Sequence, residues 1–268
     1  SKNALATRLD IWPRLAFDNQ SRREGLLFGL YFGFYVLLMA LHALFCWFTR
    51  APLSGLFLAY ISVGVANETL SLGLVQQVTR LPVQWSDPIL GVGIAVGMML
   101  GLEMSFRILA LDTLYPRLVA WVRRSTGLLA AVCSVLILLG HYGLGMPPVQ
   151  AAALLLMTML SLMAVYLLWR GWRPVRFFIL AFGGFYAGML VGFLRNLGVL
   201  PVNQITEFVS TFSGMVHMLL LSLFIIGRHE RQRRANERRQ AHAAAEMAQE
   251  HSLRLEHEVA LRTAELRN

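Results

Sequence analysis

Lysine is almost absent from this sequence, and its scarcity excludes one class of membrane protein. The single lysine, Lys2, precedes every long apolar run, so a retinal Schiff base of the microbial rhodopsin kind has no attachment point inside a helix. Only two cysteines occur, Cys46 and Cys133, and both lie within apolar runs, so no disulfide framework is indicated. The sequence also has no Gly-rich phosphate loop and no Cys and His set with metal-ligand spacing. We therefore expect no cofactor, no metal site and no catalytic residue in this segment.

Charged residues are scarce too, and their scarcity argues against a soluble domain. Only 15% of the residues are charged, whereas 56% are hydrophobic. Apolar stretches of roughly twenty residues, each long enough as a helix to cross a hydrocarbon core of about 30 Å, recur at residues 25–48, 53–79, 88–111, 125–144, 147–170, 175–197 and 202–227. The sequence thus predicts an all-α membrane protein whose residues 25–227 form a seven-transmembrane helix bundle that contacts the lipid bilayer.

The arginines indicate how this bundle is oriented. The net charge is +9, but the arginines gather at span ends and in the last forty residues without interleaved aromatic residues, which favours a membrane surface over nucleic acid. The connections after spans two, four and six carry only Arg80 and Arg195, whereas those after spans one, three and five carry Arg50, Arg117, Arg123, Arg124, Arg170, Arg173 and Arg176. Because positive charge favours the cytoplasmic side, we expect a cytoplasmic C-terminus and a periplasmic N-terminus, with residues 1–24 as a juxtamembrane linker. The chain opens on Ser1 and is expected to be a piece of a longer protein.

Residues 228–268 differ in composition from the rest of the chain. They are rich in Arg, Glu and Ala and contain no Pro and no Gly, which predicts one cytoplasmic signalling helix. Leu255, Val259 and Leu266 follow the a and d spacing of a coiled coil, with Arg262 between them. Such a seam needs a second copy, so we expect a parallel homodimer. The alternative is a single solvated charged helix.

Ionisable residues inside the spans are the candidate functional residues, because charge in hydrocarbon is costly. In the outer half of the bilayer we expect Arg195 to pair with Glu68 or Glu207, within a ligand-binding or structural polar cluster that comprises Asn67, Glu68, Arg195, Asn196 and Glu207. At the inner face, Glu103 and Arg107 stand four residues apart on one helix, which favours an ion pair. The outer cluster is also compatible with a role in helix packing alone, and the Glu103–Arg107 pair favours that role, with Arg107 extending to the inner interface.

His217, in the middle of the seventh span, is compatible with two interpretations. It is either a hydrogen-bonded packing residue or a pH-sensitive group, because the ordinary pKa of histidine is about 6.5. Glycines also recur at i,i+4 spacing in spans one, three and six, where they allow helices to approach closely inside one bundle. These glycines are Gly29, Gly33, Gly93, Gly97, Gly101, Gly184, Gly188 and Gly192.

Two short stretches carry a family resemblance. One is Leu194-Arg195-Asn196-Leu197-Gly198 with Pro201 just after it, and the other runs from Phe106-Arg107-Ile108-Leu109 through Asp112 to Tyr115-Pro116-Arg117. Together with the charged helix after Arg228, they resemble the bacterial seven-transmembrane receptors with diverse intracellular signalling modules, over about residues 25–240.

The resemblance implies a receptor of the bacterial inner membrane. Such a receptor relays an extracytoplasmic or membrane stimulus through a coiled coil to a covalently linked output domain, either the histidine kinase of a two-component system or a GGDEF diguanylate cyclase, and it carries a periplasmic sensor domain. The stimulus and the choice of output stay open. A membrane transporter or channel is the alternative function, and its signature would be inverted repeats with broken helices.

Overall fold

The computed structural model describes residues 13–172, 175–196, 198–201 and 203–265, and these residues form helices with no β-strand among them. Contacts divide the chain into two compact units, Ser1–Ser222 and Leu223–Asn268. The helices are α1 (Arg14–Thr49), α2 (Pro52–Ser71), α3 (Leu74–Thr79), α4 (Val83–Leu109), α5 (Leu111–Leu114), α6 (Pro116–Leu138), α7 (Tyr142–Trp169), α8 (Val175–Phe178), the π-helical η1 (Ile179–Gly183), α9 (Gly184–Asn196) and α10 (Gln204–Glu265).

Seven helical stretches among the described residues are long and apolar enough to cross a membrane, which confirms the predicted all-α, seven-span architecture. They are Ser21–Thr49, Pro52–Ser71, Gln84–Leu109, Pro116–Leu138, Tyr142–Trp169, Val175–Gly192 and Phe208–Ser252. The chain is therefore a multi-pass membrane protein, and a lipid bilayer is its solvent.

Several predicted spans differ in their limits from the helices, and two of them show the cause. The second was expected over residues 53–79, but α2 ends at Ser71, and Gly73 then adopts a left-handed φ of 73° that glycine tolerates without steric cost. The fourth was expected to start at residue 125, whereas α6 starts at Pro116, where proline fits the first turn of a helix. Arg117, Arg123 and Arg124 consequently lie on α6 and not in a loop. Hydropathy alone misplaced this boundary because the helix extends beyond its apolar part.

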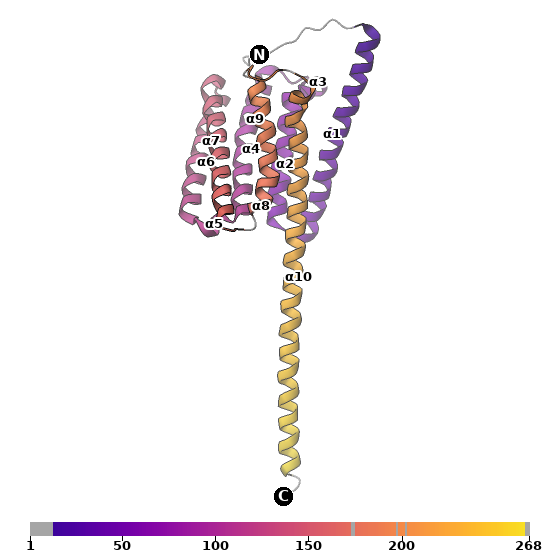
Figure 1. Ribbon diagram of the computed structural model, residues 1–268, viewed down its shortest axis with the longest axis vertical. Coiled ribbons are helices and arrows are strands. Elements are labelled where there is room, and N and C mark those ends of the chain that lie inside the picture. The colour runs from indigo at the N-terminus through magenta and orange to yellow at the C-terminus, as the bar shows by residue number, and fades with distance from the viewer. Residues whose placement is uncertain (1–12, 173–174, 197, 202, 266–268) are drawn as a thin grey trace. The chain divides into compact units, whose positions relative to one another are not determined.

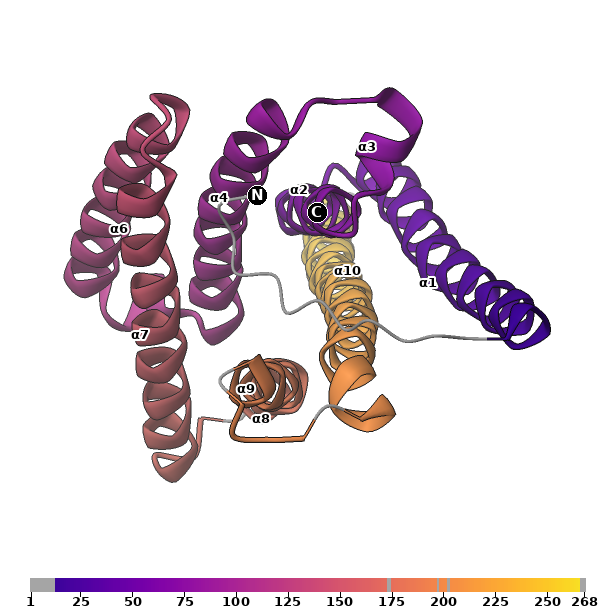
Figure 2. The same cartoon turned by 90° about the horizontal axis from the view of Figure 1, so that it is seen from above.

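The first unit is a bundle of helices that run alternately up and down (Figures 1 and 2). α1 lies at one edge and α6 with α7 at the other, while α2 and α4 lie between them (Figure 2). Packing follows the same order, since α1 contacts α2, α2 contacts α4, α4 contacts α6 and α6 contacts α7. The turns after α1, α4 and α7 share the end of the bundle that contains α5, and α3 lies at the opposite end (Figure 1). We call the α5 end the arginine-rich end, because Arg50, Arg117, Arg170 and Arg176 lie in or next to those turns.

Most glycines of the stripes in spans three and six pack closely inside this bundle, although a methyl group at Gly184 would meet nothing within 4 Å. A methyl group added at Gly97 would lie 3.6 Å from Val63 on α2, and one at Gly101 would lie 3.4 Å from the Tyr60 ring. On α9, a methyl group at Gly188 would lie 3.1 Å from the Val209 carbonyl oxygen of α10. By contrast, a methyl group at Gly29 or Gly33 on α1 would meet nothing within 4 Å. The same spacing in the sequence therefore serves close packing on α4 and α9 but not on α1.

The second unit consists of the C-terminal part of α10. Its exposed surface carries ion pairs between neighbouring turns, with Arg234 2.9 Å from Glu230 and Arg233 3.4 Å from Glu237. Exposed pairs of this kind contribute little to stability, because solvent screens them. The seam side chains of Leu255, Val259 and Arg262, and the whole of Leu266, lie outside the described residues, as do residues 1–12 of the expected linker 1–24.

Candidate functional site

His217, on α10, lies at the centre of a buried polar contact between helices. Its side chain is fully buried, and its Nδ1 lies 3.0 Å from the backbone carbonyl oxygen of Ala181. Because a carbonyl oxygen only accepts, Nδ1 carries the proton and donates it. Nε2 of the neutral ring is then an acceptor for the Tyr60 hydroxyl, which lies 3.4 Å away. The ring thus joins α10 to α2 and η1.

Two phenylalanine rings also pack against the His217 imidazole. Phe185 stacks on it with a centroid distance of 4.6 Å and an interplanar angle of 15°, and Phe182 meets it edge-on at 4.5 Å. Stacked and edge-on pairs of this kind each contribute roughly 0.5–1.5 kcal/mol beyond the burial of their area. The His217 ring is thus both hydrogen-bonded and packed against aromatic rings.

The carbonyl that accepts this bond lies in a π-helical turn. Ala181 belongs to η1, where the i→i+5 pattern replaces the regular ladder between α8 and α9. The turn ends at Gly183-Gly184, and two adjacent glycines weaken the preference of the chain for a regular α-helix. Such π turns occur frequently at functional positions of helices. Here the turn supplies the backbone acceptor for His217.

Neighbouring polar groups extend the contact to α4. Tyr60 packs over Gly101, and one turn further along α4 the Ser105 hydroxyl donates to the Gly101 carbonyl oxygen at 2.8 Å. Tyr186 on α9 lies close enough to Ser105 to interact with it. We call His217, Tyr60, Ser105, Tyr186 and the Ala181 carbonyl the polar core. It connects α2, α4, η1, α9 and α10 inside the first unit.

A second buried histidine joins α1 to the same helices. His42 is fully buried, and its Nδ1 lies 3.1 Å from the Ser54 hydroxyl of α2 while its Nε2 lies 2.8 Å from the Ser222 hydroxyl of α10. The Phe57 ring lies against it at a centroid distance of 4.4 Å. Both ring nitrogens are therefore satisfied, as a buried polar group requires.

The residues of the predicted outer cluster take different neighbours. Asn67 packs against Gly93 and Gly97 of α4, whereas Glu68 lies close enough to Tyr31 and Tyr35 of α1 to interact with them electrostatically.

Arg195, the third residue of that cluster, contacts the start of α10. Its guanidinium donates to the Thr206 carbonyl oxygen at 3.2 Å. Thr206 and Asn203 also cap α10 reciprocally, through backbone to side-chain hydrogen bonds of 3.0 and 2.9 Å. Because the side chains of Asn196 and Glu207 lie outside the described residues, the expected pairing of Arg195 stays a prediction.

At the arginine-rich end, the structure contains the expected Glu103–Arg107 ion pair, with 2.9 Å between Arg107 Nε and Glu103 Oε1. A third residue joins it, because Arg123 of α6 lies 2.9 Å from Glu103 and 3.0 Å from Asp112 of α5. The network thus holds the turn between α4 and α6. All its members are partly exposed, so each pair is worth at most about 1 kcal/mol.

Sequence reasoning missed Arg123 because it placed this residue in a loop, and it missed the partners of both histidines. Serine and tyrosine are compatible with either a buried or a lipid-facing position, so nothing in the sequence marked Ser54, Ser222, Tyr60 or Tyr186. Within the part of the chain that the structure describes, no group of three or more His, Cys, Asp or Glu side chains has a metal-binding arrangement.

The sequence model of the 7TM diverse intracellular signalling family matches residues 24–228. The chain belongs to this family. The match covers every span up to the start of the Arg-rich segment, and it includes the polar core, both buried histidines and the Glu103 network. No curated protein and no solved structure matches the chain. Because the chain belongs to the 7TM diverse intracellular signalling family, its bundle is the membrane region of a signalling protein.

Proposed function

We propose that this chain is the membrane region of a bacterial receptor that relays an extracytoplasmic or membrane stimulus to a cytoplasmic output domain. The observation that carries the proposal is that one helix, α10, includes both His217 of the polar core and the Arg-rich segment after Arg228. A change in packing at the core would therefore act on the helix that leads to the output. The output domain would be a histidine kinase or a diguanylate cyclase linked to the C-terminal end, and the family membership supports a signalling role.

The polar core suits a switch between two states. His217 is held by one backbone carbonyl, one hydroxyl and two aromatic rings from different elements. A shift of α9 or α2 would change all of these contacts together, because packed cores are bistable and do not deform continuously. A stimulus would act by binding one arrangement better than the other.

The proposed orientation places the arginine-rich end in the cytoplasm of the bacterial cell and the α3 end in the periplasm. A membrane-impermeant maleimide applied to intact cells is expected to label His141→Cys, an exposed position between α6 and α7, and to miss Thr113→Cys, an exposed position on α5. After cell lysis both variants become labelled. The unmodified chain, with Cys46 and the buried Cys133, measures the background. Labelling of Thr113→Cys alone in intact cells would reverse the orientation.

The proposed relay requires two copies whose C-terminal helices pair in parallel through Leu255, Val259 and Leu266. Cysteines introduced singly at these three positions are expected to form strong intermolecular disulfides in membranes under mild oxidation. Cysteines at His257 and Ala264, which face away from an a/d seam, serve as matched controls and are expected to crosslink weakly. Uniform or absent crosslinking at all five positions would contradict the coiled-coil relay and leave a single solvated helix.

A further inference from the structure

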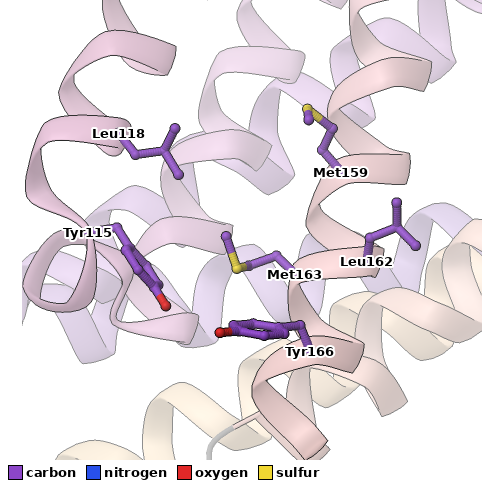
Figure 3. Close-up of a pocket in the computed structure, with 6 residues that line it drawn as sticks. All are labelled: Tyr115, Leu118, Met159, Leu162, Met163 and Tyr166. Carbon is purple, nitrogen blue, oxygen red and sulfur yellow. The ribbon is translucent and has the colours of Figure 1, made fainter. Parts of the chain in front are cut away.

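An apolar groove opens on the outer surface of the bundle between α6 and α7, near the arginine-rich end. Its volume is about 380 Å³, which falls within the range of roughly 300–1,000 Å³ typical of small-molecule sites. The groove is lined by Tyr115, Leu118, Met159, Leu162, Met163 and Tyr166 (Figure 3). Leu162 and Met159 are 65% and 61% exposed, so the groove is open to the surroundings of the bundle. In a membrane those surroundings are lipid.

The lining is amphipathic along the length of the groove. The hydroxyl groups of Tyr115 and Tyr166 point toward each other at one end, and Leu118 and Met159 lie at the other (Figure 3). The tyrosine end lies at the ends of the helices, because Tyr115 precedes α6 and Tyr166 is in the last turn of α7. Tyrosines at this position are typical of the membrane interface. The groove therefore has the polarity of a membrane lipid, with its polar end at the interface and its apolar end toward the bilayer centre.

Positive charge borders the tyrosine end. The Arg170 guanidinium lies 4.9 Å from the centre of the Tyr166 ring, which keeps it beside the groove. Arg117 is exposed and lies between the lining residues Tyr115 and Leu118 in the chain. The carboxylate of Asp112 on α5 is paired with Arg123 at 3.0 Å, and no ion pair among the described residues joins it to Arg117 or Arg170. An anionic group would complement this end, whereas a neutral or zwitterionic one would leave net positive charge.

We propose that the α6–α7 groove binds one anionic phospholipid. An acyl chain lies along Leu118, Met159 and Leu162, and the lipid phosphate lies at the tyrosine end between Arg117 and Arg170. The N-terminus of α6 at Pro116 adds the positive end of a helix dipole at the same place. Arginine suits this role because its planar guanidinium matches phosphate oxygens. This binding does not depend on the proposed signalling function.

The test compares lipid binding by the purified full chain in phosphatidylcholine nanodiscs doped with phosphatidylglycerol, read by native mass spectrometry. The unaltered chain is expected to retain one phosphatidylglycerol molecule in preference to phosphatidylcholine. The double variant Arg117→Gln, Arg170→Gln is expected to bind phosphatidylglycerol about thirtyfold more weakly, from roughly 1 kcal/mol for each arginine. Its binding of phosphatidylcholine should stay unchanged.

Two further variants examine the apolar part of the groove and the specificity of the charge. Met159→Trp fills the groove and is expected to weaken retention of both lipids, while Leu44→Trp on the exposed surface of α1 leaves it unchanged. Arg50→Gln removes a charge from the same end of the bundle, away from the groove, and should not alter the preference. Free glycerol phosphate is not expected to compete, because it has no acyl chain.

Four results would overturn the proposal. In the first, the unaltered chain shows no preference for phosphatidylglycerol, and in the second, the double variant retains that preference. In the third, Arg50→Gln loses as much phosphatidylglycerol binding as the double variant does. In the fourth, free glycerol phosphate competes fully with the lipid. Because Arg117 and Arg170 are both exposed, the double variant is expected to fold, and its thermal unfolding temperature in detergent checks this. The double variant decides the proposal even if Met159→Trp fails to fold.

Discussion

His217→Ala is expected to lower the free energy of unfolding of the bundle by about 3 kcal/mol. The substitution removes a fully buried ring that stacks on Phe185 and meets Phe182 edge-on, and it leaves a cavity between α9 and α10. It also takes the hydrogen-bond partner from the Ala181 carbonyl oxygen and from the Tyr60 hydroxyl, inside a region that water does not reach. Unfolding by dodecyl sulfate in mixed micelles, followed by circular dichroism, measures the change.

Two matched variants separate the contributions of the ring and of its hydrogen bonds. His217→Phe keeps an aromatic ring of similar size but removes both hydrogen bonds, so we expect a smaller loss of about 1–2 kcal/mol. His141→Ala removes an exposed histidine at the start of α7 and is expected to change stability by less than about 0.5 kcal/mol. If His217→Ala behaved like His141→Ala, the polar core would not hold α10 in the way described.

Much of the bundle could be predicted because lipid leaves few choices to the backbone. Only helices satisfy their own hydrogen bonds in hydrocarbon, so each long apolar stretch predicts a helix. The limits were predicted less well where a helix continues past its apolar part, as at Pro116, or ends early inside an apolar stretch, as at Ser71. In the second case the left-handed Gly73 ends the second span, and hydropathy does not record backbone conformation.

The candidate site was predicted only where its partners are close in sequence. Glu103 and Arg107 are four residues apart on one helix, so their contact follows from helix geometry. The bonds from His42 to Ser222 and from His217 to Tyr60 join residues separated by 180 and 157 positions. Those contacts depend on how the helices are arranged around one another, and a single sequence does not encode that arrangement in a readable pattern.

The glycine positions also show that a single sequence does not predict which helices come into contact. Gly29 and Gly97 both belong to i,i+4 stripes in apolar spans, yet a methyl group would be unhindered at the first and would contact α2 at the second. Spacing indicates that a close approach is possible, whereas the neighbouring helix decides whether it occurs. A close approach of α6 and α7 occurs at Gly145, which belongs to none of the stripes that the sequence singled out.

Gly145→Ala is expected to destabilise the bundle by about 3 kcal/mol, at the upper end of the usual range for overpacking. A methyl group there would lie 2.7 Å from the Cys133 carbonyl oxygen and 2.7 Å from Ile137 Cγ1, both on α6. The carbonyl belongs to the backbone of a packed helix, so a rotamer change cannot relieve this contact, and α6 and α7 must move apart. The dodecyl sulfate titration used for His217→Ala measures the loss.

Gly143→Ala, two residues earlier on α7, is the matched control for Gly145→Ala. A methyl group at Gly143 meets nothing within 4 Å, so this variant is expected to be neutral or to stabilise the helix by about 0.5 kcal/mol, because alanine favours a helix over glycine. Since both variants add one methyl group to the same turn, their difference isolates the contact with α6. Equal stability of the two variants would mean that α6 and α7 are further apart than the 2.7 Å between a Gly145 methyl group and the Cys133 carbonyl oxygen implies.

Because the same helix pair lines the α6–α7 groove, Gly145→Ala is also expected to weaken retention of phosphatidylglycerol, whereas Gly143→Ala preserves it.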